Sequence, residues 1–379
     1  MLGASNLVVG AIPAVVTLGW QLPSLFIAGH TETLAEKIPF VLRYTVWERV
    51  PFLVLALVAF FVAGPWPGLA IVTTLAMMLI VTTTGGALMP AWMDVVGRAV
   101  PMAQRGRFFA ISSTVAAVGG LLGSFLTAYL LGAFVGPPGY GACFLLASFF
   151  MGLSYIAFTL AEEPAAAGAA SPRVGIRTYL RGVPARLVDD PNFSWFLAAR
   201  ALAVVGAMAH AFYTVYALRR LEAPPWHVGV FTAMLFAGQL VGNIAFGVLA
   251  DATGHRIVIV VGAAATVAAN VLALTTSSLP AFSIVFALAG MQIASVNVSN
   301  LNVLLEFAPT EQEQPTYVGV GNTLMAPVAF AAPLAAGLLA DRLGFTTVFS
   351  VAGVFSLLAL ALLLARVRDP RHARVATRA

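Results

Sequence analysis

Charged residues are scarce in this sequence. Of its 379 residues only 9% are Asp, Glu, Lys or Arg, while 60% are hydrophobic. A soluble domain usually carries about 25% charged residues, so this chain could not cover a water-facing surface. The composition excludes soluble enzymes, nucleic-acid-binding domains and disordered scaffolds. Uninterrupted apolar runs argue against a transmembrane β-barrel, whose strands alternate over ~10 residues. We therefore expect an all-α polytopic membrane protein.

Residue types that carry covalent or metal chemistry are also scarce. Lys37 is the only lysine, and the sequence has no Gly-Lys-Ser/Thr for a phosphate-binding loop. Cys143 is the only cysteine, which excludes an intramolecular disulfide and a thiolate metal cluster. The five histidines form no pair at metal-ligand spacing. We therefore predict a protein that is no enzyme, with no catalytic residues, no metal and no cofactor.

What the sequence does contain is a series of long apolar runs separated by proline, glycine or charge. A membrane-crossing helix needs roughly 20 apolar residues. The runs predict eleven crossings, near residues 7–29, 48–64, 68–95, 108–135, 139–161, 193–218, 226–250, 256–278, 281–307, 315–340 and 343–365.

One segment interrupts the apolar pattern. Residues 162–192 contain two glutamates, an Ala/Gly/Pro stretch and four arginines, which predicts a cytoplasmic linker ending in a short amphipathic helix. We expect it to divide a five-helix bundle (1–161) from a six-helix bundle (193–365), which a basic cytoplasmic tail (366–379) follows.

The basic residues orient the chain. One set of alternate loops holds sixteen of them, including Lys37, Arg43 and Arg49, whereas the other set holds only Arg219, Arg220 and Arg342. Because basic loops stay in the cytoplasm, we expect a cytoplasmic C-terminus. Eleven crossings then put the N-terminus outside the cytoplasmic membrane.

Two stretches of the sequence resemble each other. Gly10 and Gly19 are nine residues apart, and Gly229 and Gly238 have the same spacing. This similarity predicts an internal repeat. A complete crossing precedes the second copy, whereas only nine residues precede Gly10. We therefore expect a six-plus-six protein that lacks its first helix, with Met1 a misassigned or internal start.

A loop in the second half carries a family resemblance. The sequence Gly247-Val-Leu-Ala-Asp251-Ala-Thr-Gly254-His255-Arg256 resembles the signature loop of the major facilitator superfamily, Gly-x-Leu-Ala-Asp-x-x-Gly-x-Arg. We expect Gly247 to allow close helix approach and Asp251 to cap the next helix. Gly254 should make the turn, and Arg256 should anchor the cytoplasmic face.

The resemblance implies a two-bundle fold and secondary transport of a small solute by alternating access. It also implies that the signature loop takes part in gating, and that the helix over 281–307 faces a central cavity. The corresponding N-terminal loop, Gly29-His30-Thr31-Glu32, departs from the family pattern.

Polar residues inside the crossings are the candidate site. Along 281–307, five of them recur at intervals of three and four residues and share an arc of roughly 80°: Gln292, Ser295, Ser299, Asn302 and Glu306. They either line a solute path or hydrogen-bond to neighbouring helices. Asn297 and Asn300 lie on another face, so we expect them to be packing contacts.

Charges near the cytoplasmic ends form a second candidate group. Arg200 lies ~10 Å inside its crossing, so its side chain either snorkels to the headgroups or pairs with Asp94 or Glu306. We count Arg200 among the residues of the solute path. Asp94, Glu306, Arg105 and Arg107 form a predicted charge latch. No carboxylate is expected at the midplane.

The tryptophans, including Trp20 and Trp92, are expected at the membrane interfaces.

The function that we expect is secondary transport of a small solute, with or without proton coupling, by a monomer in the lipid bilayer and without nucleic acid. The alternatives are a receptor, scaffold or lipid-handling protein on the same fold, which would move no solute, or an inactive N-truncated transporter.

Overall fold

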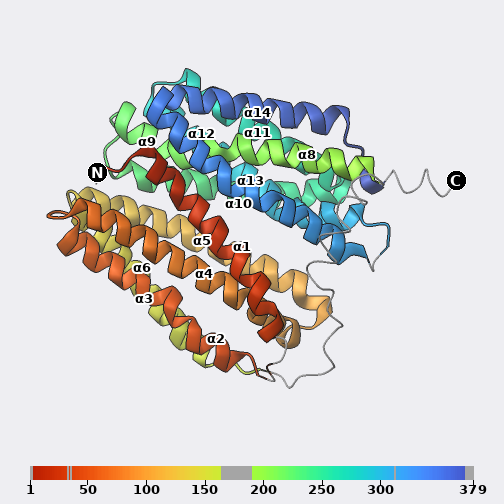
Figure 1. The fold of residues 1–379 in the computed structure, drawn as a ribbon, viewed down its shortest axis with the longest axis horizontal. Coiled ribbons are helices and arrows are strands. Elements are labelled where there is room, and N and C mark those ends of the chain that lie inside the picture. The colour runs from red at the N-terminus through yellow and green to blue at the C-terminus, as the bar shows by residue number, and fades with distance from the viewer. Residues whose placement is uncertain (1–2, 32–33, 35, 164–189, 311–312, 372–379) are drawn as a thin grey trace. The chain divides into compact units, whose positions relative to one another are not determined.

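The computed structural model describes residues 3–31, 34, 36–163, 190–310 and 313–371. Every regular element among these residues is a helix (Figure 1). The helices are α1 (Asn6–Thr31), α2 (Ile38–Tyr44), α3 (Val46–Leu57), η1 (Val58–Val62), α4 (Pro67–Ala99), α5 (Met102–Ala133), α6 (Pro137–Thr159), α8 (Pro191–Gly206), η2 (Ala207–Ala209), α9 (His210–Arg220), α10 (His227–Thr253), α11 (His255–Thr275), α12 (Leu279–Phe307), α13 (Gln314–Leu343) and α14 (Phe345–Ala365).

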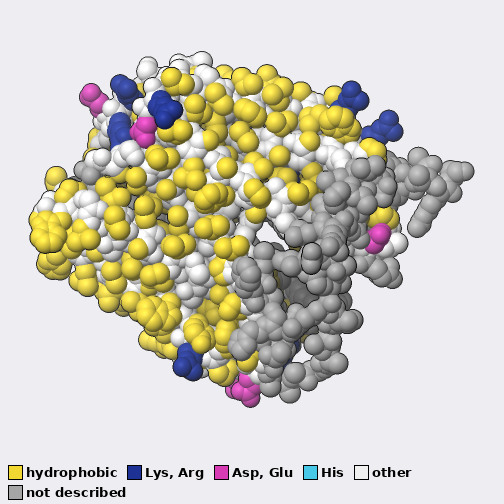
Figure 2. Space-filling view, viewed as in Figure 1, with side chains coloured by type: hydrophobic (Ala, Val, Ile, Leu, Met, Phe, Trp, Pro, Cys, Tyr) yellow, Lys and Arg dark blue, Asp and Glu magenta, His cyan; other side chains and the backbone are white. Residues whose placement is uncertain are grey.

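Eleven stretches of these helices are long and apolar enough to cross a membrane. The described residues thus confirm the predicted all-helical class and provide eleven candidate crossings. Figure 2 shows why such a surface suits lipid: hydrophobic side chains cover most of the visible face, and charged side chains stand at its margins. In hydrocarbon, backbone groups must be paired within the segment, and a helix achieves this.

Local sequence sets the helix ends. Six helices, α2, α4, α6, α8, α12 and α13, carry proline in their first turn, where its missing N–H costs nothing. Two turns consist of one glycine each. Gly254 joins α10 to α11 at φ +100°, and Gly344 joins α13 to α14 at φ +84°. Other residues rarely adopt this left-handed region.

The chain forms two compact units, residues 1–116 with 125–172, and residues 117–124 with 173–379. In the first unit, α1 packs most extensively against α4. The backbones meet at Gly19 and Gly86: a Cβ added to Gly86 would lie 2.4 Å from the Gly19 carbonyl oxygen. Only a residue without a side chain fits this crossing.

The second unit repeats this arrangement with α10 and α12. A Cβ added to Gly238 would lie 2.1 Å from the Ala287 carbonyl oxygen, and one added to Gly290 would lie 2.1 Å from that of Leu235. Gly19 and Gly238, the second glycines of the two similar stretches, thus both lie at a close helix crossing. The described structure therefore supports an internal repeat.

The hydrophobic core of the second unit is aromatic at one end. Tyr213, Phe231 and Phe282 are all almost fully buried, and the rings of Phe231 and Phe286 stack 4.5 Å apart. The buried Asn270 accepts a hydrogen bond from the Tyr213 hydroxyl at 2.9 Å. Its pairing removes the cost of a polar group in the core.

One predicted boundary is wrong. We expected a loop from residue 30 to 50, but the second crossing is a 25-residue stretch, Ile38–Val62. The charged pair Glu48 and Arg49 lies inside it. Thr45 keeps helical torsions between α2 and α3 (φ −64°, ψ −12°), so the helix continues across the position at which the charges suggested an end. The amphipathic helix predicted in the linker lies outside the described residues.

Candidate functional site

The second unit contains a cavity of about 250 Å³ enclosed by α8, η2, α11, α12 and α14. Its wall is largely apolar, and its polar lining residues are Arg200, Thr266, Gln292, Ser295 and Asn300. None of the described residues that line it is acidic. A concave, mostly apolar site with a few convergent polar groups is the usual form of a small-molecule site.

Arg200 supplies the charge of this cavity. Its Nη1 donates to the Gly321 carbonyl oxygen at 3.1 Å, and its Nη2 donates to Asn322 Oδ1 at 3.1 Å. Gly321 is the eighth residue of α13, so α13 holds the guanidinium within the second unit. Of the two carboxylates that we considered as partners, Glu306 lies in the same unit, and its ion pair is with Arg371.

The predicted polar stripe of α12 divides into parts with different surroundings. Gln292 and Ser295 line the cavity. Ser299 is fully buried, and its hydroxyl lies 3.1 Å from His255 Nδ1 on α11. Asn302 is exposed, and its amide donates to the Val298 carbonyl oxygen.

The expectation for Asn300 was wrong. This residue lines the cavity, although the helical arc predicted a packing contact. The cavity-lining face of α12 therefore runs through Gln292, Val296 and Asn300, one residue in every four. Ser299 lies beside this face, where α11 covers it.

The signature loop follows our expectations only in part. Gly254 forms the turn, with φ +100°. The Arg256 guanidinium donates to the carbonyl oxygens of Leu363 and Val367, both at 2.8 Å. These carbonyl groups lie at the C-terminal end of α14, where the helix has no further backbone N–H groups to pair with them.

The other two signature residues differ from our expectations. A Cβ on Gly247 would meet nothing within 4 Å, whereas one on Gly242 would lie 2.7 Å from Ala294 Cβ. Gly242 therefore makes the close approach. Asp251 lies within α10 and is exposed, and no side chain caps α11. The single-residue turn at Gly254 leaves α11 no room for a capping loop.

Glu306 lies at the end of α12. Its carboxylate is 4.0 Å from Arg371 Nε, and Arg371 is also 3.5 Å from Asp369. Arg371 covers the turn at Gly254, where an added Cβ would collide with its guanidinium. The loop after α14 therefore joins the signature loop and α12 at one end of this unit.

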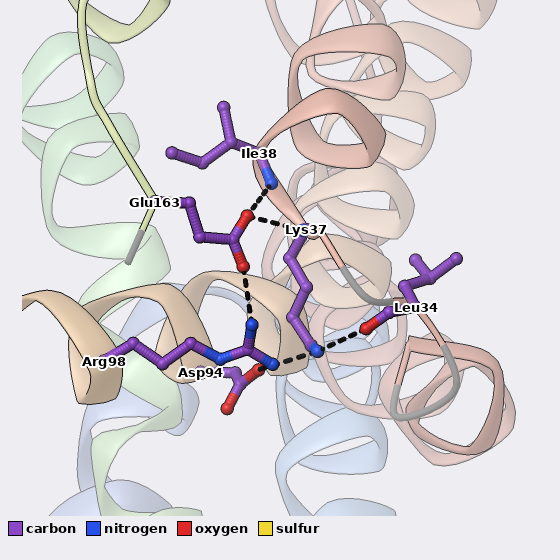
Figure 3. A network of polar contacts seen from close by, with 6 residues as sticks. All are labelled: Leu34, Lys37, Ile38, Asp94, Arg98 and Glu163. Carbon is purple, nitrogen blue, oxygen red and sulfur yellow. Dashed lines mark hydrogen bonds and ion pairs between the residues drawn. The ribbon is translucent and has the colours of Figure 1, made fainter. Parts of the chain in front are cut away.

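The first unit has a denser charge cluster at one end (Figure 3). Lys37 Nζ lies 2.8 Å from Asp94 Oδ2, and Arg98 lies 2.7 Å from the same oxygen. Arg98 also binds Glu163 at 2.9 Å. Glu163 in turn accepts the backbone N–H groups of Lys37 and Ile38, at 2.6 and 2.9 Å. One carboxylate thus caps α2 and connects it to α4 and α6.

This cluster revises the predicted latch. The partners of Asp94 are Lys37 and Arg98, which belong to the same unit. Arg105 and Arg107 are the fourth and sixth residues of α5, and their side chains lie outside the described part of the chain. The Lys37 side chain is only 4% exposed, so we assign its ion pair with Asp94 a structural role in place of a gating role.

The first unit also contains a cavity that the sequence analysis missed. Its volume is about 260 Å³, and α1, α2, α3, α4 and α6 enclose it. Glu48 and Arg49 line it together with Trp20 and Trp92, two residues that we expected at the membrane interfaces. The sequence signal for this cavity was the isolated Glu48-Arg49 pair inside an otherwise apolar run. An apolar run that two charges interrupt can still form one helix.

The fold defines a polytopic α-helical membrane protein. The Major Facilitator Superfamily profile matches residues 211–379. No curated protein matches the chain by sequence.

Among solved structures, a variant of the nucleoside transporter NupG is similar, with 10% identity, a TM-score of 0.74, and coverage of 97% of this chain and 92% of that one. A bacterial homolog of the human lysosomal transporter Spinster has 13% identity, a TM-score of 0.69 and coverage of 97% and 90%. The D-xylose-proton symporter has 13% identity, a TM-score of 0.68 and coverage of 96% and 88%.

The family match in the second half and the fold of the whole chain confirm the resemblance given by the signature loop. The chain has the fold of the Major Facilitator Superfamily, and the similar structures are those of solute transporters.

Proposed function

We propose that this protein carries a small solute across the cytoplasmic membrane by alternating access. Residues 1–161 and 193–365 form the two bundles that rock about a midplane site, residues 162–192 link them, and the C-terminus and the tail 366–379 lie in the cytoplasm. The protein works as a monomer.

The observation that carries this proposal is the cavity around Arg200. It combines an apolar wall with a guanidinium, two amides and two hydroxyls in one membrane-embedded unit. Burying such polar groups in lipid is costly and usually marks a solute path. Arg200 and Asn300 supply donors, so a solute with hydrogen-bond acceptors suits this wall.

The test is uptake by proteoliposomes that contain the full chain. A panel of labelled polar solutes is offered with and without an imposed pH gradient, and empty liposomes give the background. We expect at least one solute to accumulate. Stimulation by the gradient would support proton coupling. Saturable binding without uptake of any solute would contradict the proposal and favour a receptor.

A matched pair of variants connects uptake to the cavity. Arg200→Gln removes the guanidinium, and we expect it to reduce uptake at least tenfold, since a hydrogen bond to a charged group contributes about 1.5–3 kcal/mol. Arg220→Gln removes an arginine from the exposed end of α9 and should leave uptake unchanged. Equal uptake by both variants would show that Arg200 is not part of the path.

A further inference from the structure

The cavity of the first unit contains a carboxylate near the middle of the second crossing, although we expected none at the midplane. Glu48 is ten residues after Ile38, the start of the second crossing, so it lies about 15 Å along the helix at 1.5 Å per residue. This is half of a hydrocarbon core of about 30 Å. An ionisable group at this depth is costly to bury, so one that faces a cavity is a candidate for a functional role.

One edge of the Glu48 carboxylate is available to an occupant of the cavity. Oε2 accepts a hydrogen bond from the Thr45 hydroxyl at 2.6 Å. Oε1 lies over Gly85, 2.8 Å from the position of an added Cβ, and Trp20 lies 3.3 Å from the same position. The missing side chain of Gly85 therefore leaves the space in which the carboxylate and the indole lie together.

Arg49 also lines the cavity, but two of its guanidinium nitrogens donate to the protein. Nε donates to the Met151 carbonyl oxygen and Nη1 to the Thr45 carbonyl oxygen, both at 3.0 Å. Its guanidinium carbon lies 5.5 Å from the centre of the Tyr155 ring. The nearest Glu48 oxygen is 3.9 Å away. Arg49 thus offsets part of the cost of burying the carboxylate without covering Oε1.

The remaining walls are aromatic. Trp20 and Trp92 line the cavity, and Trp92 packs edge-on against Phe158 with ring centres 5.4 Å apart. Indole rings attract cations, most strongly where water is excluded. A carboxylate beside two indoles therefore suits a positive group attached to an apolar body, whereas an anion would be repelled. The volume of about 260 Å³ lies just below the range of drug-sized sites.

We propose that this cavity binds a small organic cation, with its ammonium group on Glu48 and its apolar body against Trp20 and Trp92. The conclusion that the cation is a transported solute rests on the proposed transport function, whereas binding itself is measured without transport.

The first experiment compares three probes of similar shape and different charge: phenethylammonium, the neutral phenethyl alcohol and the anionic hydrocinnamate. Binding to the full chain in lipid nanodiscs is measured by equilibrium dialysis. We expect the cation to bind about tenfold more tightly than the alcohol or better, and hydrocinnamate not to bind. Equal binding of the three probes would overturn the proposal.

Two matched variants locate the binding. Glu48→Gln keeps the shape and removes the charge, so it should abolish the preference for the cation. Glu162→Gln removes an exposed carboxylate after the end of α6 and should leave all three affinities unchanged. Retention of the cation preference by Glu48→Gln would place the binding elsewhere and overturn the proposal.

A second measurement uses the unsubstituted chain, so its result cannot be affected by misfolding of a variant. Dicyclohexylcarbodiimide modifies carboxyl groups in apolar surroundings, and mass spectrometry quantifies the adduct at Glu48. Phenethylammonium should slow this modification severalfold, and hydrocinnamate should not. If modification responds to pH but not to the cation, Glu48 is a proton site and the proposal is wrong. Binding and protection without uptake in proteoliposomes would instead refute only the proposed transport function.

Discussion

The two units have the same helix crossing and differ in the charge inside their cavities. Gly19 and Gly86 bring α1 onto α4, and Gly238 and Gly290 bring α10 onto α12. The first cavity, however, presents a carboxylate and the second a guanidinium. A crossing of two backbones accepts only glycine, whereas a cavity wall accepts many side chains. The repeat therefore determines how the helices of each unit pack, whereas the charged residues that line the cavities can differ between the units.

The largest effect should come from the two close helix contacts, α1 against α4 and α10 against α12. Gly86→Ala and Gly238→Ala place a Cβ within 2.4 Å and 2.1 Å of a carbonyl oxygen, and overpacking of this kind costs at least ~1–3 kcal/mol. We expect both variants to lose most of their monodisperse yield in detergent, as size-exclusion chromatography would measure.

Gly247→Ala is the matched control for these variants, because an added Cβ meets nothing within 4 Å. Alanine should be neutral or stabilise the helix by roughly 0.5–1 kcal/mol. If only one of the two crossing variants fails to fold, the equivalence of the two crossings is wrong.

A smaller effect is expected from the charge clusters at the ends of the units. Glu163→Gln loses the ion pair with Arg98 and weakens the cap of α2, which should cost about 1–3 kcal/mol since the group is buried. Thermal unfolding of the purified chain measures the loss. Glu162→Gln should change stability by less than about 0.5 kcal/mol, and a similar loss in both variants would contradict a specific role of Glu163.

The face of α12 that lines the second cavity can be tested without a substrate. In a Cys143→Ala background, Asn300→Cys should react with a water-soluble maleimide severalfold faster than Ser299→Cys. Asn300 lines the cavity, whereas Ser299 is fully buried beside His255. Mass spectrometry of the intact chain gives both rates. Faster reaction at Ser299→Cys would restore the originally predicted stripe as the cavity face.

The smallest effect on stability is expected at Asp251. Its side chain is exposed and caps no helix, so Asp251→Asn should change stability by less than about 0.5 kcal/mol. Uptake by proteoliposomes should fall nevertheless if the signature loop takes part in switching. Thermal unfolding and uptake are measured on the same preparation, and unchanged uptake would make Asp251 an ordinary surface residue.

Hydropathy predicted most of the fold, because a crossing helix is mainly an uninterrupted apolar run. It failed at Glu48 and Arg49. The cost of the two charges suggested a loop, but Thr45, Met151 and Tyr155 stabilise them within the helix. These partners come from another helix as well as the same one, so no local pattern reveals them.

The candidate site was harder to predict. Periodicity placed Gln292, Ser295 and Ser299 on one arc of α12, but it contains no information about which neighbouring helix covers that arc. In the structure α11 covers Ser299 through His255, and Asn300 lines the cavity in its place. The partners of Arg200, Gly321 and Asn322, lie 121 and 122 residues away in the sequence and could not be inferred from it.

The single-glycine turns limit how the second unit can move. Gly254 alone connects α10 to α11, and Gly344 alone connects α13 to α14, so each connection offers only the two soft torsions of one residue. The adjoining ends of the paired helices cannot separate, so the two helices of a pair can move relative to each other only by hinging at the glycine. A rearrangement of this unit then has few independent degrees of freedom. Inserting a flexible residue beside Gly254 would add freedom at the connection on which the signature loop is built.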